Sequence, residues 1–432
     1  MKRISIVLIL VAGFFAVSGS AAAGLAGQSG LTSINNLPGM NFGPFINIWL
    51  ETNIDSDSPA VAYNRLHNEY LVVWHNDRGP TIDVYARRVK ADGTLLSNFT
   101  ISHNANFRNY NPDVAYSSKH DEYLVVWTYD SIITGSDTWA RRVKWDGSWM
   151  GPEFQVGRPD RSGNQVNPAV AYNEQADEYL VVYENRWGAT KDIDAQRVRA
   201  SDGQVLSWAN IATSPGTLRH FPDVAYSPED DNYLIVYWYQ PSSSTDPGDI
   251  LGKAVNSNMS EMSNEINICV DANDQSFPSV AGEANEFLVV WEDNPSSSTH
   301  EIYARRIASD GIPQGPAGGF WISGTPGSGN GSPQVASGAT GGYLVVWDRY
   351  MGGVDFNVHG RFVRPGIDSG FNSEFPIDND ILKQWHPAAA CNQTGDCLVV
   401  ESDGNSAGGD QEIRGRLIWF ARVFLPINLK GY

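Results

Sequence analysis

The sequence has few cysteines, a deficit of basic residues and no helical apolar pattern beyond its first residues. Only 3 of 432 residues are Cys, and 30 Lys and Arg stand against 49 Asp and Glu, which gives a formal net charge of −19. Phosphate backbones and anionic lipid headgroups repel so acidic a surface, so we expect no nucleic-acid or membrane partner. After residue 26 no stretch has the 3.6-residue period of an amphipathic helix or the length of a membrane span.

Motifs that mark common hydrolases are also missing. The chain has no Gly-x-Ser-x-Gly elbow and no His-Glu-x-x-His helix. No Cys follows the N-terminal apolar run directly, so a lipoprotein anchor is not expected. The sequence therefore predicts no catalytic residue, no metal ligand and no cofactor, and it leaves enzymatic activity open but disfavoured.

The first 26 residues have the order of regions found in a secretory signal peptide. Lys2 and Arg3 precede the apolar run Ile4–Val17, which is followed by the small residues Ser18–Ala23. We expect cleavage near Ala23 or Ala26. The mature protein is then expected to be secreted or held at the cell surface, without an integral membrane segment, as a monomer.

A unit of 53 to 56 residues occurs seven times. Each copy opens on a Pro-x-Val-Ala-like block, followed by a block such as EYLVVW at Glu69–Trp74 and a block such as DVYARRV from Asp83. Most copies continue with an Asp-Gly turn and a short apolar piece such as Phe99–Ile101. The copies begin at Pro59, Pro112, Pro168, Pro222, Pro278, Pro333 and Pro387.

These blocks predict an all-β fold, a seven-bladed β-propeller with four antiparallel strands in each blade. They are short, rich in β-branched and aromatic residues, and bounded by Gly, Pro, Asn and Asp. Radial repetition of such units leaves few exposed sheet edges. The small first block suits the innermost strand, and the continuously apolar second block suits a strand covered on both faces.

The two chain ends offer alternative ways to complete the last blade. The last copy has only three blocks, and Phe45–Ile48 precedes Pro59 at the spacing of a fourth strand. We expect this N-terminal strand to close the ring, which removes an open edge. The tail 421–432 competes for the same place, as a last strand or as a sorting tail. The expected divisions are a signal peptide (1–26), a linker (27–44), the propeller (45–420) and this tail.

The repeat motif PxVAYN…EYLVVW…DIYARRV…DG resembles repeats of secreted, mostly uncharacterised bacterial propeller proteins, and more distantly TolB-like repeats. The resemblance covers about residues 45–420. It implies the propeller architecture and transfers no catalytic residue. The Ser-x-Asp-x-Gly-x-Thr-Trp box of sialidases and the Asp-x-Asp-x-Asp-Gly loop of integrin-like repeats are both absent.

Two of the three cysteines replace a pair of tyrosines. Cys391 and Cys397 fall where the first copy has Tyr63 and Tyr70, which face each other across a predicted hairpin. In an exported protein this placement predicts a disulfide. Cys269 is left over, and we expect it to be buried as a small apolar group.

Charges recur in the third block of the repeat. It opens with an acid in six of seven copies, and a basic residue follows four positions later in six of seven. A ring of cation sites would fit this pattern, but so would ordinary pairing within or between blades. We favour pairing, because a ligand site normally departs from the repeat.

The loops that depart from the repeat are where we expect ligand binding. Connections from fourth to first strands and from second to third strands share one face of a propeller. Aromatic rings flanked by Asn, Asp and Arg suit a sugar or peptide, although the same groups would also serve to plug the channel. The candidate ligand-binding residues are Arg108, Tyr110, Trp187, Arg219, His220, Trp238, Trp385 and His386.

Three functions remain open from the sequence. The first is a secreted, non-catalytic propeller that binds glycan or protein through its loop face. The second is a carbohydrate-active hydrolase or lyase, for which carboxylates such as Asp77, Asp130, Asp293 and Asp403 would have to pair within a deep mouth. The third is a structural cell-surface or matrix protein, whose mouth its own side chains would seal.

Overall fold

The computed structural model describes residues 40–420 with several short gaps, and these residues form strands and no helix. Accordingly, no helix among them is long and apolar enough to span a membrane. The expected signal peptide, the first part of the linker and the tail 421–432 lie outside the described residues. The gaps are 52–53, 80, 103–106, 132–134, 160–162, 189, 215, 242–246, 284, 297–298, 325–328, 339–340, 353–354, 371–372, 381–382 and 405–410.

The described strands pair into seven antiparallel groups of four, which are the blades. Blade 1 contains β2 (Asp55–Asn64), β3 (Glu69–Asp77), β4 (Ile82–Lys90) and β5 (Leu95–Thr100). Blade 2 contains β6 (Arg108–Ser117), β7 (Glu122–Ser131), β8 (Gly135–Lys144) and β9 (Phe154–Gln155). Blade 3 contains β10 (Asn164–Asn173), β11 (Glu178–Trp187), β12 (Thr190–Arg199) and β13 (Val205–Ala212).

The remaining blades follow the same order. Blade 4 contains β14 (Leu218–Ser227), β15 (Asn232–Gln240), β16 (Asp249–Asn256) and β17 (Ile266–Cys269). Blade 5 contains β18 (Asp274–Glu283), β19 (Glu286–Ser296), β20 (Thr299–Ala308) and β21 (Phe320–Trp321). Blade 6 contains β22 (Gly329–Ser337), β23 (Tyr343–Gly352), β24 (Asp355–Val363) and β25 (Phe375–Asp378). Blade 7 contains β26 (Lys383–Cys391), β27 (Cys397–Gly404), β28 (Gln411–Phe420) and the N-terminal β1 (Met40–Trp49).

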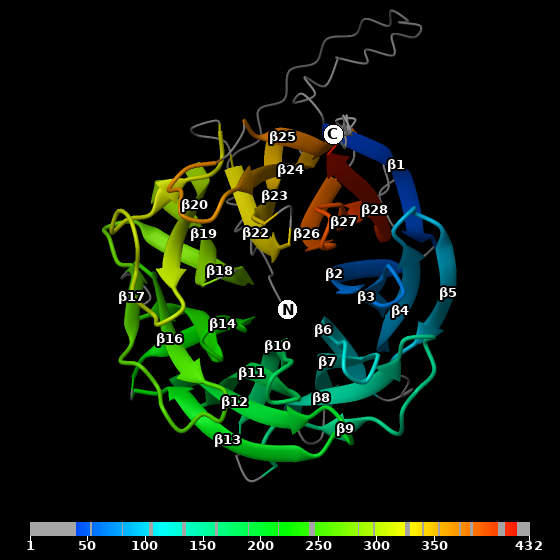
Figure 1. Cartoon of the computed structure of the whole chain (residues 1–432), viewed down its shortest axis with the longest axis horizontal. Coiled ribbons are helices and arrows are strands. Elements are labelled where there is room, and N and C mark those ends of the chain that lie inside the picture. The colour runs from blue at the N-terminus through cyan, green and yellow to red at the C-terminus, as the bar shows by residue number, and fades with distance from the viewer. Residues whose placement is uncertain are drawn as a thin grey trace, which may run out of the picture.

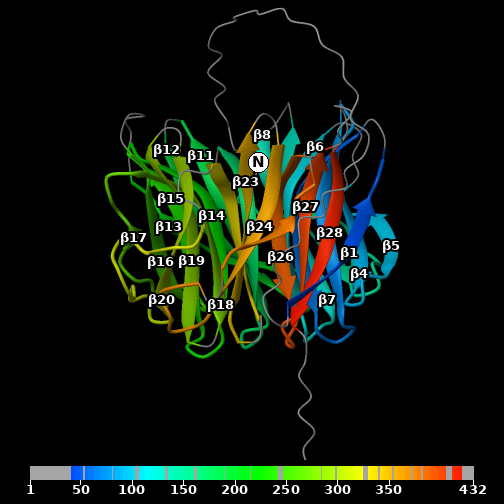
Figure 2. The same ribbon diagram turned by 90° about the horizontal axis from the view of Figure 1, so that it is seen from above.

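The blades stand in a ring around a central axis. Figure 1 shows the first strand of each blade nearest the centre and the fourth strands at the rim. Figure 2 shows that the strands run roughly along the axis. This arrangement confirms the predicted all-β propeller.

The N-terminal strand closes the ring, as predicted. β1 pairs antiparallel with β28, so that Ile46 lies opposite Gly415 and Asn47 opposite Arg414 (Figure 1). The strand is longer than the expected Phe45–Ile48. Because β1 occupies the fourth place of blade 7, the two ends of the described chain are tied into one sheet.

The hydrophobic core is divided into layers between neighbouring blades. Along β3, Tyr70 and Val72 pack against blade 7, whereas Leu71 and Val73 pack against blade 2. Alternate side chains of a strand point to opposite faces, and here both faces are covered. This is why the second block of the repeat is apolar at every position.

The cysteines confirm the predicted disulfide. Cys391 and Cys397 are bonded, with an S–S distance of 2.04 Å, and lie opposite each other on β26 and β27. Cys269, at the end of β17, is a free and fully buried thiol.

A bulge interrupts the first strand of every blade just before the repeat proline. The residue preceding that proline is never Gly, yet its φ lies between 48° and 55° in all seven blades. A bulge places two residues opposite one and so redirects the side chains beside it. The seven bulged residues are Ser58, Asn111, Asn167, Phe221, Phe277, Ser332 and His386.

Candidate functional site

A pocket of about 510 Å³ opens beside the axis, with walls from blades 1, 2, 6 and 7. In three of these blades, both residues before the repeat proline line the pocket, because the bulge lets two consecutive side chains reach the same side. These three pairs are Asp57 with Ser58, Tyr110 with Asn111, and Trp385 with His386. Second and third strands and their connections supply His75, Asp77, Ile82, Asp130, Asp348, Phe356 and Gln411, and Arg108 comes from the start of β6.

Asp57 and Asp348 meet at His386. The Nδ1 atom of His386 lies 2.7 Å from Asp57 Oδ1, and the backbone N–H of His386 donates to Asp348 Oδ2 at 3.4 Å. The hydroxyl of Ser402 also donates to Asp57 Oδ1, at 2.8 Å. Two carboxylates from blades 1 and 6 are thereby held at one residue of blade 7.

The environments of these two carboxylates move their pKa values in opposite directions. Burial alone would raise the pKa of Asp57, but the charge of His386 and its hydrogen bond hold that pKa well below its usual range. Burial raises the pKa of Asp348 to about 6, although His386 and Ser332 act against the rise. Asp57 is therefore ionised at neutral and mildly acidic pH, whereas Asp348 keeps its proton up to about pH 6.

His75 adds a neutral imidazole to the pocket. Burial lowers its pKa to about 4, and its Nδ1 atom is buried without a hydrogen-bond partner. Opposite charges nearby, on Asp57 and Asp77, only partly counteract the burial. This ring is therefore neutral at neutral and mildly acidic pH.

The rest of the pocket offers contacts for a polar ligand with apolar faces. Arg108 is half exposed, and its Nη2 lies 3.6 Å from Asp77 Oδ2. The rings of Trp385 and Phe356 meet edge to face at 6.5 Å between centroids. An apolar platform with a few charged groups around it is typical of small-ligand pockets.

The structure divides the eight residues predicted to bind ligand. Arg108, Tyr110, Trp385 and His386 line the pocket, and Trp187 lies at the exposed end of β11 outside it. Arg219 and His220 are buried in blade 4, and Trp238 packs against His220 with ring centroids 4.9 Å apart. Phe221 and Phe277 complete this aromatic cluster, in which rings of blades 4 and 5 pack against one another.

Ion pairs fix the blade 4 residues further. Arg219 lies 3.2 Å from Glu265, and His220 Nδ1 lies 3.4 Å from Glu184. Burial would raise the pKa of Glu184, but the hydrogen bond and charge of His220 lower it to about 2. Arg219 Nε and His220 Nε2 are nevertheless buried without a hydrogen-bond partner, so these groups satisfy one another only in part.

Several pocket residues were not among the candidates from the sequence. Asp77 and Asp130 were considered as catalytic carboxylates and do line the pocket, whereas Asp293 and Asp403 are buried elsewhere between blades. Asp57, His75 and Asp348 were missed as site residues. The available signal was positional, since Asp57 stands two residues before a repeat proline, as Tyr110 and Trp385 do.

Comparisons with known proteins support the fold. No family model and no curated protein matches the chain, so the repeat resemblance has no support from sequence comparison. Among solved structures, a Dyadobacter fermentans protein of unknown function matches with a TM-score of 0.57 and 11% identity, over 89% of this chain and 100% of that chain. The polysaccharide lyase Uly1 matches with a TM-score of 0.57 and 9% identity, over 84% and 90% of the two chains.

A third solved structure is the GH93 α-L-arabinofuranosidase of Fusarium graminearum in complex with arabinobiose. It matches with a TM-score of 0.50 and 13% identity, over 87% of this chain and 97% of that chain. The chain shares the β-propeller fold with these structures. Two of the three are carbohydrate-active enzymes by name, and at these identities the likeness is one of fold.

Proposed function

We propose that this protein is a carbohydrate-active enzyme that hydrolyses glycosidic bonds in the pocket between blades 1, 2, 6 and 7. The observation that carries the proposal is the pair Asp57 and Asp348, two carboxylates at one residue with pKa values driven apart. Glycoside hydrolysis requires one carboxylic acid and one carboxylate.

The roles follow from the protonation states. Asp348, protonated up to about pH 6, would donate a proton to the leaving oxygen. Asp57, ionised and aligned by His386 and Ser402, would act on the opposite side as the base or nucleophile. Trp385 would provide the apolar surface on which a sugar ring rests.

The solved structures are consistent with this proposal, because the fold hosts glycan-cleaving enzymes in proteins named as an arabinofuranosidase and a polysaccharide lyase. We therefore prefer catalysis to the non-catalytic binder favoured by the sequence. We further propose that the protein acts outside the cell as a monomer, which its N-terminal pattern and its disulfide support.

The test is release of reducing ends from a panel of plant, algal and bacterial polysaccharides. Asp348→Asn and Asp57→Asn should each lower the rate by about 10²–10⁴-fold, the usual contribution of general acid–base catalysis. Asp202→Asn, an exposed turn position outside the pocket, is the matched control. Cleavage that survives Asp348→Asn would refute the proposal, and binding without any cleavage would favour the non-catalytic binder.

The same assay has a defined pH dependence. A general acid must be protonated, so the rate should fall as the pH rises through about 6, where Asp348 loses its proton. Because the pKa of Asp57 is depressed, its protonation should not lower the rate at any pH above 4. A rate that keeps rising from pH 6 to 8 would contradict the assignment of Asp348.

A second reaction, elimination from a uronate-containing glycan, is favoured by one observation. His75 is a neutral, buried base without a partner on Nδ1, and the half-exposed Arg108 in the same pocket could bind a uronate carboxylate. Elimination would leave an unsaturated uronate that absorbs ultraviolet light. In that case His75→Asn would abolish the activity, and Asp348→Asn would not.

A further inference from the structure

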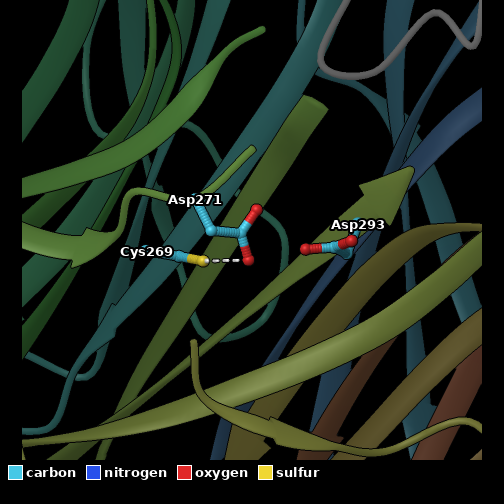
Figure 3. Close-up of side chains that lie close together, drawn as sticks. All are labelled: Cys269, Asp271 and Asp293. Atoms are coloured by element: carbon cyan, nitrogen blue, oxygen red, sulfur yellow. Dashed lines mark hydrogen bonds between the residues drawn. The ribbon is translucent and has the colours of Figure 1, made fainter. Parts of the chain in front are cut away.

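Three potential metal ligands converge at the junction of blades 4 and 5, away from the pocket. They are Cys269 at the end of β17, Asp271 just after it and Asp293 on β19, and Figure 3 shows the three side chains turned toward one another. Their ligand atoms lie within 4.8 Å of one another, and Cys269 Sγ is 3.9 Å from Asp271 Oδ2. A tetrahedral ion with metal–sulfur and metal–oxygen distances of about 2.3 and 2.1 Å would hold these atoms about 3.6 Å apart.

The junction of blades 6 and 7 has the same arrangement at equivalent positions, and there it surrounds a cation. Asp378 and Asp380 stand nine and seven residues before the repeat proline, as Cys269 and Asp271 do. The guanidinium of Arg414 lies between them, 3.6 Å from Asp378 and 3.2 Å from Asp380.

The remaining members of the two clusters also correspond. Asp403 lies opposite Gln384 in blade 7, as Asp293 lies opposite Gln275 in blade 5. Arg414 Nη1 is 2.5 Å from Asp403 Oδ2. These positions therefore form a cation site within this fold.

Blade 5 has no basic residue at the position that holds the cation in blade 7. Arg414 lies opposite Glu401 in blade 7, and the corresponding pair in blade 5 is Tyr303 opposite Trp291. The nearby Arg305 donates instead to backbone carbonyl oxygens, among them that of Ile268 at 2.8 Å. The ligands of blade 5 thus lack the internal cation of blade 7.

Gln275 brings a fully buried amide to the blade 5 cluster. Its Nε2 donates to Asp271 Oδ1 and to the carbonyl oxygen of Asn273, both at 2.7 Å, and lies 3.4 Å from Asp293 Oδ2, whereas its Oε1 has no partner. An unpaired buried amide oxygen is costly. One side chain thus contacts both carboxylates of the cluster and leaves one polar atom without a partner.

We propose that Cys269, Asp271 and Asp293 bind one divalent transition-metal ion, with Zn²⁺ the best match, and that water completes a tetrahedron. A thiolate with two carboxylates suits Zn²⁺ better than Ca²⁺ or Mg²⁺, which prefer oxygen ligands alone. On binding, the metal–sulfur bond replaces the S–H bond and one proton is released to solvent. Asp271 is exposed, which gives the ion a route to the buried thiol.

The proposal is tested by titrating the metal-free mature protein with Co²⁺, followed by competition with Zn²⁺. We expect one equivalent of Co²⁺ per chain, a cobalt–thiolate charge-transfer band that Cys269→Ser removes, and displacement by Zn²⁺. Asp271→Asn should weaken Zn²⁺ binding at least tenfold. Asp380→Asn, at the equivalent position of blade 7, is the matched control and should bind like the wild type.

Absence of the thiolate band, or equal Zn²⁺ affinity of Asp271→Asn and wild type, would overturn the proposal. The melting temperature of each metal-free variant checks that it is folded. Zn²⁺ should raise this temperature for the wild type and for Asp380→Asn but not for Asp271→Asn. These readouts do not depend on glycan cleavage, so the metal site and the enzymatic activity succeed or fail separately.

Discussion

At the scale of single residues, the bulge before each repeat proline decides what faces the channel. A left-handed backbone conformation costs a non-glycine residue a conformational free energy of roughly 1–2 kcal/mol. This conformation occurs before the repeat proline in all seven blades. The chemistry then depends on which side chain occupies the position. In blades 4 and 5 it is Phe221 and Phe277, whose rings pack against each other, whereas Ser58, Asn111 and His386 line the pocket.

The buried Asp348 should make stability depend on pH. Its pKa is about 6 in the folded protein against an ordinary 3.8, so the folded state binds this proton more tightly. The resulting stabilisation is complete below pH 3.8 and is lost as the pH rises through 6. Asp348→Asn, which cannot ionise, should therefore be more stable than the wild type by about 2–3 kcal/mol at pH 8 and nearly unchanged at pH 4.

Urea unfolding at the two pH values measures this difference. Asp310→Asn, at an exposed turn, should show no such dependence. If Asp348→Asn shifted stability equally at pH 4 and pH 8, ionisation of Asp348 would not be the cause.

At the scale of elements, the charges of the third strand join blades to one another. Arg87 donates to the carbonyl of Ile48 and Arg361 to that of Ile322, both at 2.8 Å, and Lys253 donates to that of Ile211 at 2.7 Å. Each acceptor belongs to the end of the preceding blade's fourth strand or follows it directly. In these blades the recurrent basic residue thus has a structural role, as favoured from the sequence, although its partner is a backbone carbonyl and not the recurrent acid. In blade 2, Arg141 pairs with Glu153 instead, at 3.2 Å.

The disulfide acts on a single hairpin. Cys391 and Cys397 close a loop six residues apart between β26 and β27, so their bond restricts only a short segment of the unfolded chain. The double substitution Cys391→Ala and Cys397→Ala should lower the free energy of unfolding by about 2 kcal/mol. Reductant should destabilise the wild type by a similar amount and leave the double variant unchanged; a response of the variant to reductant would point to another cause.

At the scale of the whole molecule, one strand from the N-terminus holds the ring together. β1 supplies the fourth strand of blade 7, and its Ile48 is fully buried between blades 7 and 1. Without β1, β28 would present an unpaired edge and the core layer beneath it would be open.

Two truncations test this closure. A chain that begins at Met40 keeps β1 and should unfold in one transition as a monomer. A chain that begins at Leu50 lacks β1 and should self-associate and unfold at a lower temperature, because an open sheet edge recruits other strands. Size-exclusion chromatography and thermal melting distinguish the two; equal behaviour would show that β1 is dispensable.

The sequence by itself determined the architecture, because each blade is a local unit. The four blocks of each copy pair with their neighbours along the chain, so spacing and alternation suffice to predict them, as with Tyr63 opposite Tyr70 in blade 1. The disulfide follows from the same register, since Cys391 and Cys397 replace such a pair. Closure by the N-terminal strand was predictable because the last copy of the repeat lacks its fourth block, and an extra block of that kind precedes the first copy.

Only the tertiary structure decided where the site lies. Asp57 and His386 are 329 positions apart in the sequence, and they touch because the ring closes. A sequence that repeats seven times does not indicate which blades contribute residues to a binding site. What breaks this equivalence is packing across the axis. Rings of blades 4 and 5 pack against one another on one side, and residues of blades 1, 2, 6 and 7, among them Asp57 and His386, line a pocket on the other.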